Sequence, residues 1–150
     1  MSNELNVTSL NSMTEVRLLE EAKTARMTSY SPYSNCSVGA ALLTKSGKIY
    51  PGCNIENAAY SPGVCAERVA IFKAVSDGAR QSDFVAIAVV GGKGEQTDGA
   101  FPPCGVCRQV MREFCNDDFT VYLVGAGENY ETLTLSQLLP HSFSAKEHMN

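Results

Sequence analysis

The sequence predicts an α/β protein, a three-layer α-β-α sandwich around a mixed five-stranded sheet. Five short segments have the composition of strands, at 38–44, 49–53, 84–90, 120–124 and 130–134. Helical patterns precede the first strand, separate the second from the third and the third from the fourth, and follow the fifth. This order along the chain is typical of helices packed on both faces of one mixed sheet.

The strand patterns differ in what they predict. Segments 38–44 and 49–53 flank a short loop that contains Gly47, which indicates a β-hairpin. Segment 84–90 is almost unbroken apolar sequence, as expected of a strand that is covered on both faces. Segment 130–134 is the weakest pattern and is expected at an edge of the sheet.

The first helix is predicted over about 12–28. Ser12 and Glu15 match a capping box, in which a hydroxyl and a carboxylate three residues later accept hydrogen bonds from free backbone N–H groups. The apolar stripe expected to pack on the sheet contains Val16, Leu19 and Ala22.

Two further helices are expected to start at cysteine motifs. One follows Cys65 and ends at Asp77-Gly78, and the other runs roughly from Cys104 to Phe114. A short helix over 135–139 is ended by Pro140. Because a strand precedes each cysteine motif, both helix N-termini are expected at the same edge of the sheet, where α/β proteins usually bind ligands.

Length and composition limit the function. A chain of 150 residues predicts a single domain, placed at 12–150, with residues 1–11 as a disordered polar tail. The net charge of −4 argues against a nucleic-acid partner, because phosphate binding needs clustered Lys and Arg. No apolar run approaches the roughly 20 residues that cross a membrane. We therefore expect a cytoplasmic protein with a small-molecule substrate, and no nucleic-acid or membrane partner.

Six cysteines in a chain with no secretory signal indicate metal binding or catalysis rather than disulfides. Cys65, Cys104 and Cys107 are expected to converge as thiolate ligands of Zn²⁺, with one position left for water or hydroxide. A redox Cys-x-x-Cys pair and a structural zinc site, closed by Cys53 or Cys115, remain alternatives. Isolated cysteines such as these two and Cys36 are otherwise expected to be small buried apolar residues.

Two charged residues beside Cys65 favour the catalytic alternative. Glu67 is a candidate proton carrier, which a structural zinc site does not need, although a carboxylate is also common in the first turn of a helix. Three thiolates on one dication leave a net negative centre that would weaken acidification of bound water. The Arg68 guanidinium is expected to offset this charge. The sequence predicts a zinc hydrolase.

The motifs resemble a known family. Cys-Ala-Glu at 65–67 and Pro-Cys-x-x-Cys at 103–107 resemble the zinc-dependent nucleoside and nucleobase deaminases. Asn-Ile-Glu-Asn at 54–57 is similar to the short homotetrameric cytidine deaminases of the cytidine and deoxycytidylate deaminase family. The likeness extends from Ser-Pro-Tyr-Ser at 31–34 to Leu-Leu-Pro-x-x-Phe at 138–143 and covers most of the chain.

The resemblance implies hydrolytic deamination of cytidine and 2′-deoxycytidine to the uridine forms and ammonia, for pyrimidine salvage. It implies one Zn²⁺ per subunit and Glu67 as the residue that moves protons between water, ring nitrogen and leaving ammonia. It further implies a homotetramer with shared active sites. The substrate-binding residues implied are Asn54 and Glu56 for the sugar, the Ala66 backbone N–H for the pyrimidine carbonyl, and Tyr60 and Phe143 reaching a neighbouring subunit.

Two other functions remain open. The chain could deaminate another aminopyrimidine compound such as blasticidin S, although Asn54 and Glu56 favour a sugar. A non-catalytic structural zinc module is the alternative from a different class, and it would not need Glu67.

Cys36 departs from the family pattern, in which an aromatic residue after Ser-Pro-Tyr-Ser-x stacks on the pyrimidine, and Phe143 is the residue expected to compensate. Base–aromatic stacking contributes about 1–3 kcal/mol. We therefore predict that Cys36→Phe lowers the Michaelis constant for cytidine in steady-state assays. An unchanged or higher constant would mean that position 36 does not face the base.

Overall fold

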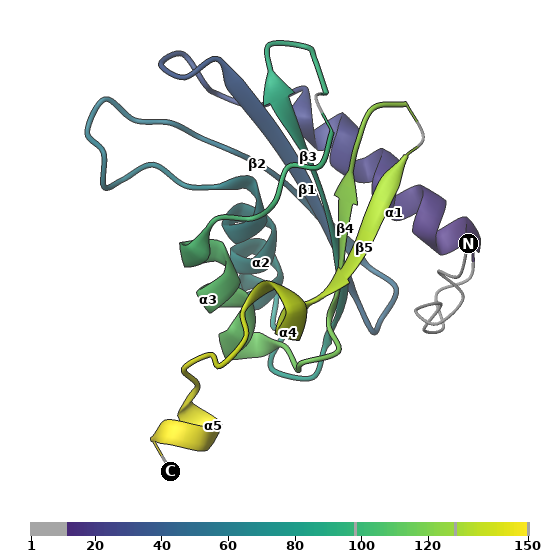
Figure 1. The fold of residues 1–150 in the computed structure, drawn as a ribbon, viewed down its shortest axis with the longest axis vertical. Helices are drawn as coiled ribbons and strands as arrows, with labels where there is room; N and C mark the ends of the chain where they lie inside the picture. Colours follow the sequence, from purple (N-terminus) through teal and green to yellow (C-terminus); the bar gives the residue numbers. More distant parts are fainter. Residues whose placement is uncertain (1–11, 98, 128, 150) are drawn as a thin grey trace.

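The computed structural model describes residues 12–97, 99–127 and 129–149. Within them a five-stranded mixed sheet has the order β2-β1-β3-β4-β5 (Figure 1). The strands are β1 (Cys36–Thr44), β2 (Ile49–Cys53), β3 (Phe84–Lys93), β4 (Thr120–Val124) and β5 (Tyr130–Thr134). The helices are α1 (Ser12–Arg26), α2 (Ala66–Ser76), α3 (Gly105–Phe114), α4 (Leu135–Leu138) and α5 (Ala145–His148). The predicted tail at 1–11 lies outside the described residues.

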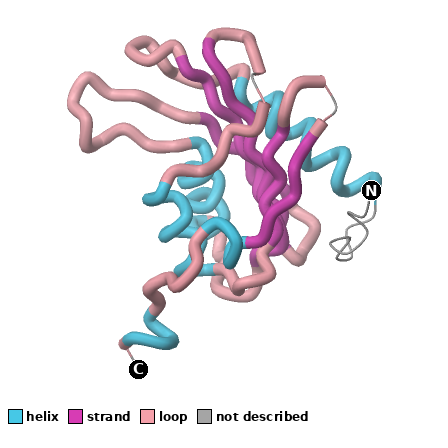
Figure 2. The backbone as a smooth tube through the Cα atoms, in the orientation of Figure 1, coloured by secondary structure: helices cyan, strands magenta, loops and turns pink. Residues whose placement is uncertain are grey.

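Helices cover both faces of the sheet, which confirms the three-layer prediction. Helix α1 lies on one face, and α2 and α3 lie on the other (Figures 1 and 2). Two separate apolar clusters result, because alternate residues of each strand point to opposite faces. The cluster under α2 and α3 includes Val38, Ile87 and Val121, and the one under α1 includes Ala41 and Ala88.

All five predicted strands are present, and two of them extend beyond their predicted limits. β1 begins at Cys36 and β3 continues to Lys93, because the two strands pair antiparallel along their full length. Strand β3 is buried from Ala86 to Gly92, as its apolar sequence predicts. β5 is an edge strand, paired only with β4.

Helix α1 differs from its prediction in the face that it buries. Its buried side chains are Leu18, Leu19, Ala22 and Ala25, whereas Val16 is 58% exposed. The predicted apolar stripe included Val16 and omitted Leu18. The buried face of the helix is therefore turned around the helix axis from the predicted one. Ser12 is already helical, so the capping position precedes it and falls outside the described residues. The helix ends at Arg26 rather than Thr28, and the short helix α5 was not predicted.

The strand directions bring two helix N-termini together. β1 is antiparallel to both of its neighbours, so β2 and β3 run parallel to each other on either side of it. The carboxyl ends of β2 and β3 therefore lie at the same end of the sheet, and from there the chain continues into α2 and α3. Each of these helices has a cysteine at its N-cap position, Cys65 for α2 and Cys104 for α3.

Helix α2 lies directly on the backbone of β2. A Cβ atom at Gly52 would stand 2.4 Å from the Ala66 carbonyl oxygen and 2.6 Å from the Ala70 nitrogen. Such distances are far below van der Waals contact, so only glycine permits this spacing between strand and helix. Gly52 thereby determines how closely the Cys65 end of α2 approaches the sheet. No helix in the described ranges is long and apolar enough to span a membrane.

We predict that Gly52→Ala lowers the free energy of unfolding by about 1–3 kcal/mol, because α2 must move off the sheet to admit the methyl group. Urea unfolding measures this change. Gly105→Ala is the matched control, since nothing lies within 4 Å of its Cβ position at the start of α3. It should leave stability unchanged or raise it by up to about 1 kcal/mol. Equal stability of both variants would show that α2 does not lie this close.

Candidate metal centre

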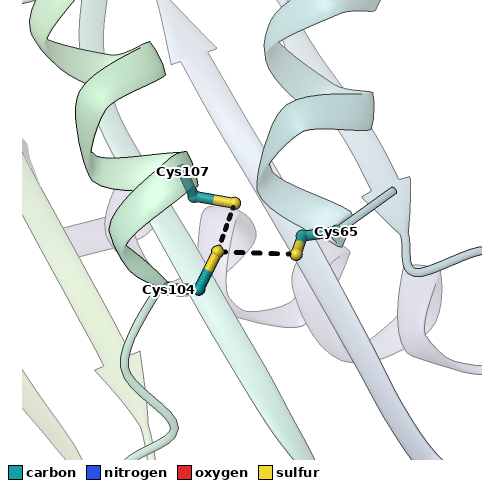
Figure 3. A group of neighbouring side chains, drawn as sticks. All are labelled: Cys65, Cys104 and Cys107. Atoms are coloured by element: carbon teal, nitrogen blue, oxygen red, sulfur yellow. Dashed lines mark hydrogen bonds between the residues drawn. The ribbon is translucent and has the colours of Figure 1, made fainter. Parts of the chain in front are cut away.

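Three cysteine thiols meet at the edge of the sheet where α2 and α3 begin (Figure 3). Cys65 and Cys104 occupy the two N-cap positions, and Cys107 lies in the first turn of α3. Cys104 Sγ lies 3.7 Å from Cys65 Sγ and 3.5 Å from Cys107 Sγ. All three sulfur atoms lie within 4.8 Å of one another, as the sequence predicted.

The spacing and chemistry of the three sulfur atoms fit a zinc ion. Zinc–thiolate bonds of about 2.3 Å in a tetrahedron place sulfur atoms about 3.8 Å apart, close to the two measured separations. In the described residues the group contains these three thiols and no fourth cysteine. Cys53 and Cys115, the alternatives considered for closing a structural site, are not members. A tetrahedral ion held by three ligands keeps one position for another ligand.

The thiols influence each other's protonation. The pKa of Cys65 is lowered to about 5 by its interaction with the Cys107 thiol and by Arg68, whose Nη2 atom donates to its sulfur. The interaction with Cys65, together with burial, raises the pKa of Cys107. One thiolate is therefore already favoured by the protein itself. A dication at the centre of the group would favour loss of the remaining protons.

Glu67 is a buried carboxylate beside the thiols. It lies in the first turn of α2 and is 3% exposed. Burial raises the pKa of Glu67 to about 7, and the nearby Cys65 charge acts in the same direction. A carboxyl group with a pKa near neutrality can both accept and donate a proton at physiological pH. An ordinary solvated glutamate of a first helical turn would be exposed, so this alternative is not what the structure shows.

Arg68 donates to the metal-binding group rather than pointing to solvent. Its Nη2 atom donates to Cys65 Sγ at 3.4 Å, and this contact raises the pKa of the guanidinium. Its Nε atom is buried and has no hydrogen-bond partner within the described part of the chain. The positive charge is thus held next to the sulfur atoms, where the sequence analysis expected it.

A cavity of about 620 Å³ opens beside the thiols. A volume of this size is typical of small-molecule sites. Cys65, Ala66, Glu67, Arg68 and Cys104 form the part of its wall at the two helix N-termini. The remaining lining residues include Cys36 and Val38 of β1, Asn54 and Glu56 after β2, Tyr33, Tyr60 and Phe101. Eight of the predicted site residues therefore line one cavity, together with Cys36.

Ala66 is the first residue of α2. Its methyl group is fully buried, so what it can offer a ligand is its backbone. The first N–H groups of a helix have no intrahelical acceptor, and they carry the positive end of the helix dipole. An acceptor oxygen in the cavity would find a donor there.

Asn54 is held by hydrogen bonds on both sides of its amide. Oδ1 accepts from the Val38 backbone N–H at 2.9 Å and from the Ser29 hydroxyl, and Nδ2 donates to the Cys36 carbonyl at 2.8 Å. An amide nitrogen has two hydrogens, so one N–H remains to be used. The side chain therefore fixes β1 to the segment after β2 and is itself fixed toward the cavity.

Glu56 organises the loop before β1. Its Oε1 atom accepts from the backbone N–H groups of Tyr33 and Ser34, at 2.9 and 3.1 Å, and Oε2 accepts from the Ser34 hydroxyl. The Ser34 hydroxyl is the main reason that the pKa of Glu56 is lowered. A carboxylate offers about four lone-pair sites. Glu56 thus stays ionised and keeps acceptor capacity for a ligand hydroxyl.

The two aromatic residues expected to act between subunits lie differently. Tyr60 is fully exposed at the cavity rim, in the long loop that projects between β2 and α2 (Figure 2). Phe143 does not line the cavity; it is 56% exposed and its ring stacks on His148 with centroids 5.1 Å apart. Within one chain Phe143 therefore does not compensate for the missing aromatic residue at position 36.

The three other cysteines have different surroundings. Cys115 is buried in the core, as expected of a small apolar side chain, and burial raises its pKa. Cys53 is half-buried and donates to the Thr28 carbonyl at 3.5 Å. Cys36 is half-buried and lines the cavity, so it is not the small buried packing residue that was predicted.

Two residues of the site, Ser34 and Phe101, were not among those predicted from the sequence. Ser34 had no assigned role, yet it connects Glu56 to the loop before β1. Phe101 had no assigned role either, although it lines the cavity. A large apolar residue in an otherwise polar loop, three positions before Cys104, was the available signal.

Comparison with known proteins identifies the family. Residues 13–123 match the cytidine and deoxycytidylate deaminase zinc-binding region. The chain belongs to the cytidine and deoxycytidylate deaminase family. It is 52% identical over 131 residues to the cytidine deaminase of Sporosarcina psychrophila, covering 87% of this chain and 92% of that protein. The residues that match the family model, 13–123, include both segments that carry the three thiols.

The fold of this chain is also similar to that of a cytidine deaminase of known structure. The crystal structure of cytidine deaminase from Burkholderia pseudomallei superimposes with a TM-score of 0.80 and 44% identity, over 89% of this chain and all of that one. The blasticidin-S deaminase of Bacillus cereus is more distant, at 30% identity over 129 residues, covering 84% of this chain and 90% of that protein. The relatives of this chain therefore include deaminases named for different substrates.

We predict that Cys107→Ser reduces the zinc bound per chain to a small fraction of the wild-type amount, because a serine hydroxyl stays protonated where a thiolate ligand is needed. Zinc is measured by atomic spectroscopy on the purified protein. Cys53→Ser is the matched control, since it keeps a hydrogen-bond donor near Thr28 and lies outside the thiol group. It should retain full zinc. Equal zinc in both variants would contradict the assignment of the site.

Proposed function

We propose that the protein is a cytoplasmic deaminase that converts cytidine and 2′-deoxycytidine to uridine and 2′-deoxyuridine with release of ammonia, in pyrimidine salvage. The observation that carries the proposal is the buried carboxylate of Glu67 beside three thiols in a nucleoside-sized cavity. Family membership supports the reaction type. One zinc ion per subunit, held by Cys65, Cys104 and Cys107, is part of the proposal.

Glu67 is the proposed proton carrier. When bound, the zinc ion supplies a nucleophile by lowering the pKa of a water molecule toward neutrality. Glu67 accepts the proton of that water and delivers it to the ring nitrogen next to the attacked carbon. It then takes the remaining proton from the hydroxyl added to the carbon and passes it to the amine, so that the C–N bond breaks, ammonia leaves and the oxygen becomes the uracil carbonyl. A carboxyl pKa of about 7, caused by burial, suits a group that alternates between base and acid.

The groups around Glu67 have proposed binding roles. Arg68 offsets the negative charge of three thiolates through its contact with Cys65. The Ala66 backbone N–H, at the start of α2, donates to the pyrimidine carbonyl oxygen. With the carbonyl held at the helix terminus, the carbon that bears the amine can face the metal position.

Asn54 and Glu56 are proposed to hold the sugar. Asn54 has one amide N–H left after its contacts with Ser29, Val38 and Cys36, and Glu56 retains acceptor sites. The 3′-hydroxyl, which cytidine and 2′-deoxycytidine share, can accept a hydrogen bond from the amide N–H and donate one to the carboxylate. Because internal hydrogen bonds fix both side chains, little side-chain entropy is lost when the sugar binds.

The cavity charges favour a nucleoside over a nucleotide. Two carboxylates, Glu56 and Glu67, line the cavity, and the one cation among its described lining residues is Arg68, which is engaged with Cys65. A 5′-phosphate would meet carboxylates without a free cationic partner. We therefore propose that the substrate is uncharged at the 5′ position.

A homotetramer with shared active sites is the proposed assembly. Tyr60 is fully exposed on a projecting loop, and Phe143 lies in the segment that extends from α4 to α5, away from the sheet (Figure 1). Large exposed aromatic side chains at such places are typical of interface anchors. Each is proposed to reach the cavity of a neighbouring subunit.

The alternatives make different demands on the site. Blasticidin S lacks the ribose or deoxyribose 3′-hydroxyl that Asn54 and Glu56 are proposed to hold, which disfavours it as the main substrate. A structural zinc module would have no use for a buried carboxylate with a raised pKa. A carboxylate buried at this cost is more common at catalytic positions.

We predict that Glu67→Gln lowers kcat for cytidine by more than about 100-fold while zinc content and thermal stability are retained, because the amide cannot carry the proton. Turnover is followed by ultraviolet absorbance. Glu113→Gln, an exposed position on α3, is the matched control and should behave like the wild type. A structural zinc module would predict no functional difference between these proteins.

The same assay on the wild-type protein compares cytidine, 2′-deoxycytidine, cytosine, cytidine 5′-monophosphate and blasticidin S. The proposal requires turnover of the first two and little turnover of the others. Preference for blasticidin S or the nucleotide would overturn the assigned substrate class.

A further inference from the structure

The apolar wall of the cavity is built around Phe101. Its ring lies over Gly91 of β3: a Cβ atom at Gly91 would stand 2.8 Å from both Cγ and Cδ1 of Phe101, and 3.1 Å from Val38 Cγ2. Gly91 pairs with Val38 across the β1–β3 ladder. The missing side chain at position 91 therefore makes the space in which the aromatic ring lies on the sheet.

The neighbouring β1 residues leave this ring accessible to a ligand. Cys36 and Val38 are two positions apart and so point to the same face of the sheet. Both line the cavity together with Phe101. A small thiol at position 36 and a branched side chain at position 38 leave room beside the Phe101 ring.

The backbone fixes Phe101 relative to the thiol group. Pro102 and Pro103 connect it to Cys104, and each proline restricts φ. Pro103 is buried, and Arg108 Nε donates to its carbonyl oxygen at 2.8 Å. The second donor of Arg108, Nη1, bonds the Leu138 carbonyl at 2.6 Å and so ties the segment to α4.

The other aromatic residues that line the cavity in the described part of the chain do not offer such a surface. Tyr33 and Tyr60 line the cavity but are 63% and fully exposed, which places them at the rim. Phe143 is absent from the lining. Phe101 alone among the described aromatic residues of the cavity is half-buried and packed against the core under α2 and α3.

We propose that Phe101 is the wall against which the pyrimidine ring packs, and that it determines substrate affinity in place of an aromatic residue at position 36. This inference rests on the proposed function and adds a specificity-determining residue to it. Loss of one base–aromatic contact weakens binding about 5- to 150-fold. The ring contributes to binding the substrate and product alike, so its loss should raise KM and leave kcat nearly unchanged.

The test compares Phe101→Leu with Phe114→Leu. Phe114 packs against the same core and contacts Phe84 with centroids 5.4 Å apart, but it lies outside the cavity lining. Phe101→Leu should raise KM for cytidine about 10-fold or more, with kcat within about 2-fold of wild type and zinc unchanged. Inhibition by uridine should weaken by the same factor. Phe114→Leu should reduce stability without changing KM.

A second substitution tests whether position 36 and position 101 serve the same purpose. Cys36→Phe should lower KM more in the Phe101→Leu background than in the wild-type protein, because it returns a ring to a cavity that has lost one. Should Phe101→Leu fail to fold, Phe101→Met, which keeps the apolar volume, is measured in the same way.

The outcomes separate the two proposals. A wild-type protein that does not deaminate cytidine overturns the proposed function, and this inference with it. A wild-type protein that does so, with KM and uridine inhibition unchanged in Phe101→Leu, overturns the inference alone. Loss of zinc or an equal fall of kcat in Phe101→Leu would assign the residue to loop structure and would also overturn it.

Discussion

The parallel course of β2 and β3 on either side of β1 is the constraint on which the site depends. It delivers two chain segments to the same edge of the sheet, and each segment turns there into a helix whose N-cap residue is a cysteine. A helix N-terminus carries partial positive charge, which stabilises a thiolate. Two such termini in contact concentrate that effect on three sulfur atoms. The close approach of α2 to Gly52 sets the position of one of them.

Burial then differentiates the charged groups around the sulfur atoms. Glu67 and Arg68 are neighbours in sequence, yet one is buried in the cavity wall and the other contacts Cys65. In a medium of low dielectric constant the guanidinium and the thiolate interact strongly, whereas a carboxylate without a cation of its own is held near its neutral form. The same few residues thus provide a compensated metal position and a carboxyl group that titrates near neutrality.

The far side of the cavity is organised by hydrogen bonds rather than by charge. Asn54 and Glu56 use most of their capacity to hold the end of β1 and the loop at Tyr33 and Ser34. Both residues line the cavity, and these hydrogen bonds fix their side chains there. Phe101 and Val38 add an apolar surface to the same cavity. A ligand with a polar sugar, a flat ring and a reactive carbon matches these surfaces.

The sequence by itself determined the five strands, the two helices that start at cysteines, and the three thiols as a metal-binding group. The strands, the helices and the Cys104–Cys107 pair follow from local periodicity and from spacing within a motif, and the approach of Cys65 to that pair follows from the repeated order of strand and helix. The tertiary structure decided which face α1 buries, because Leu18 and Val16 both fit a helical pattern and contact with the sheet selects between them. It also decided the roles of Ser34 and Phe101, since their partners, Glu56 and Gly91, are brought to them by strand pairing and loop packing that no local pattern encodes.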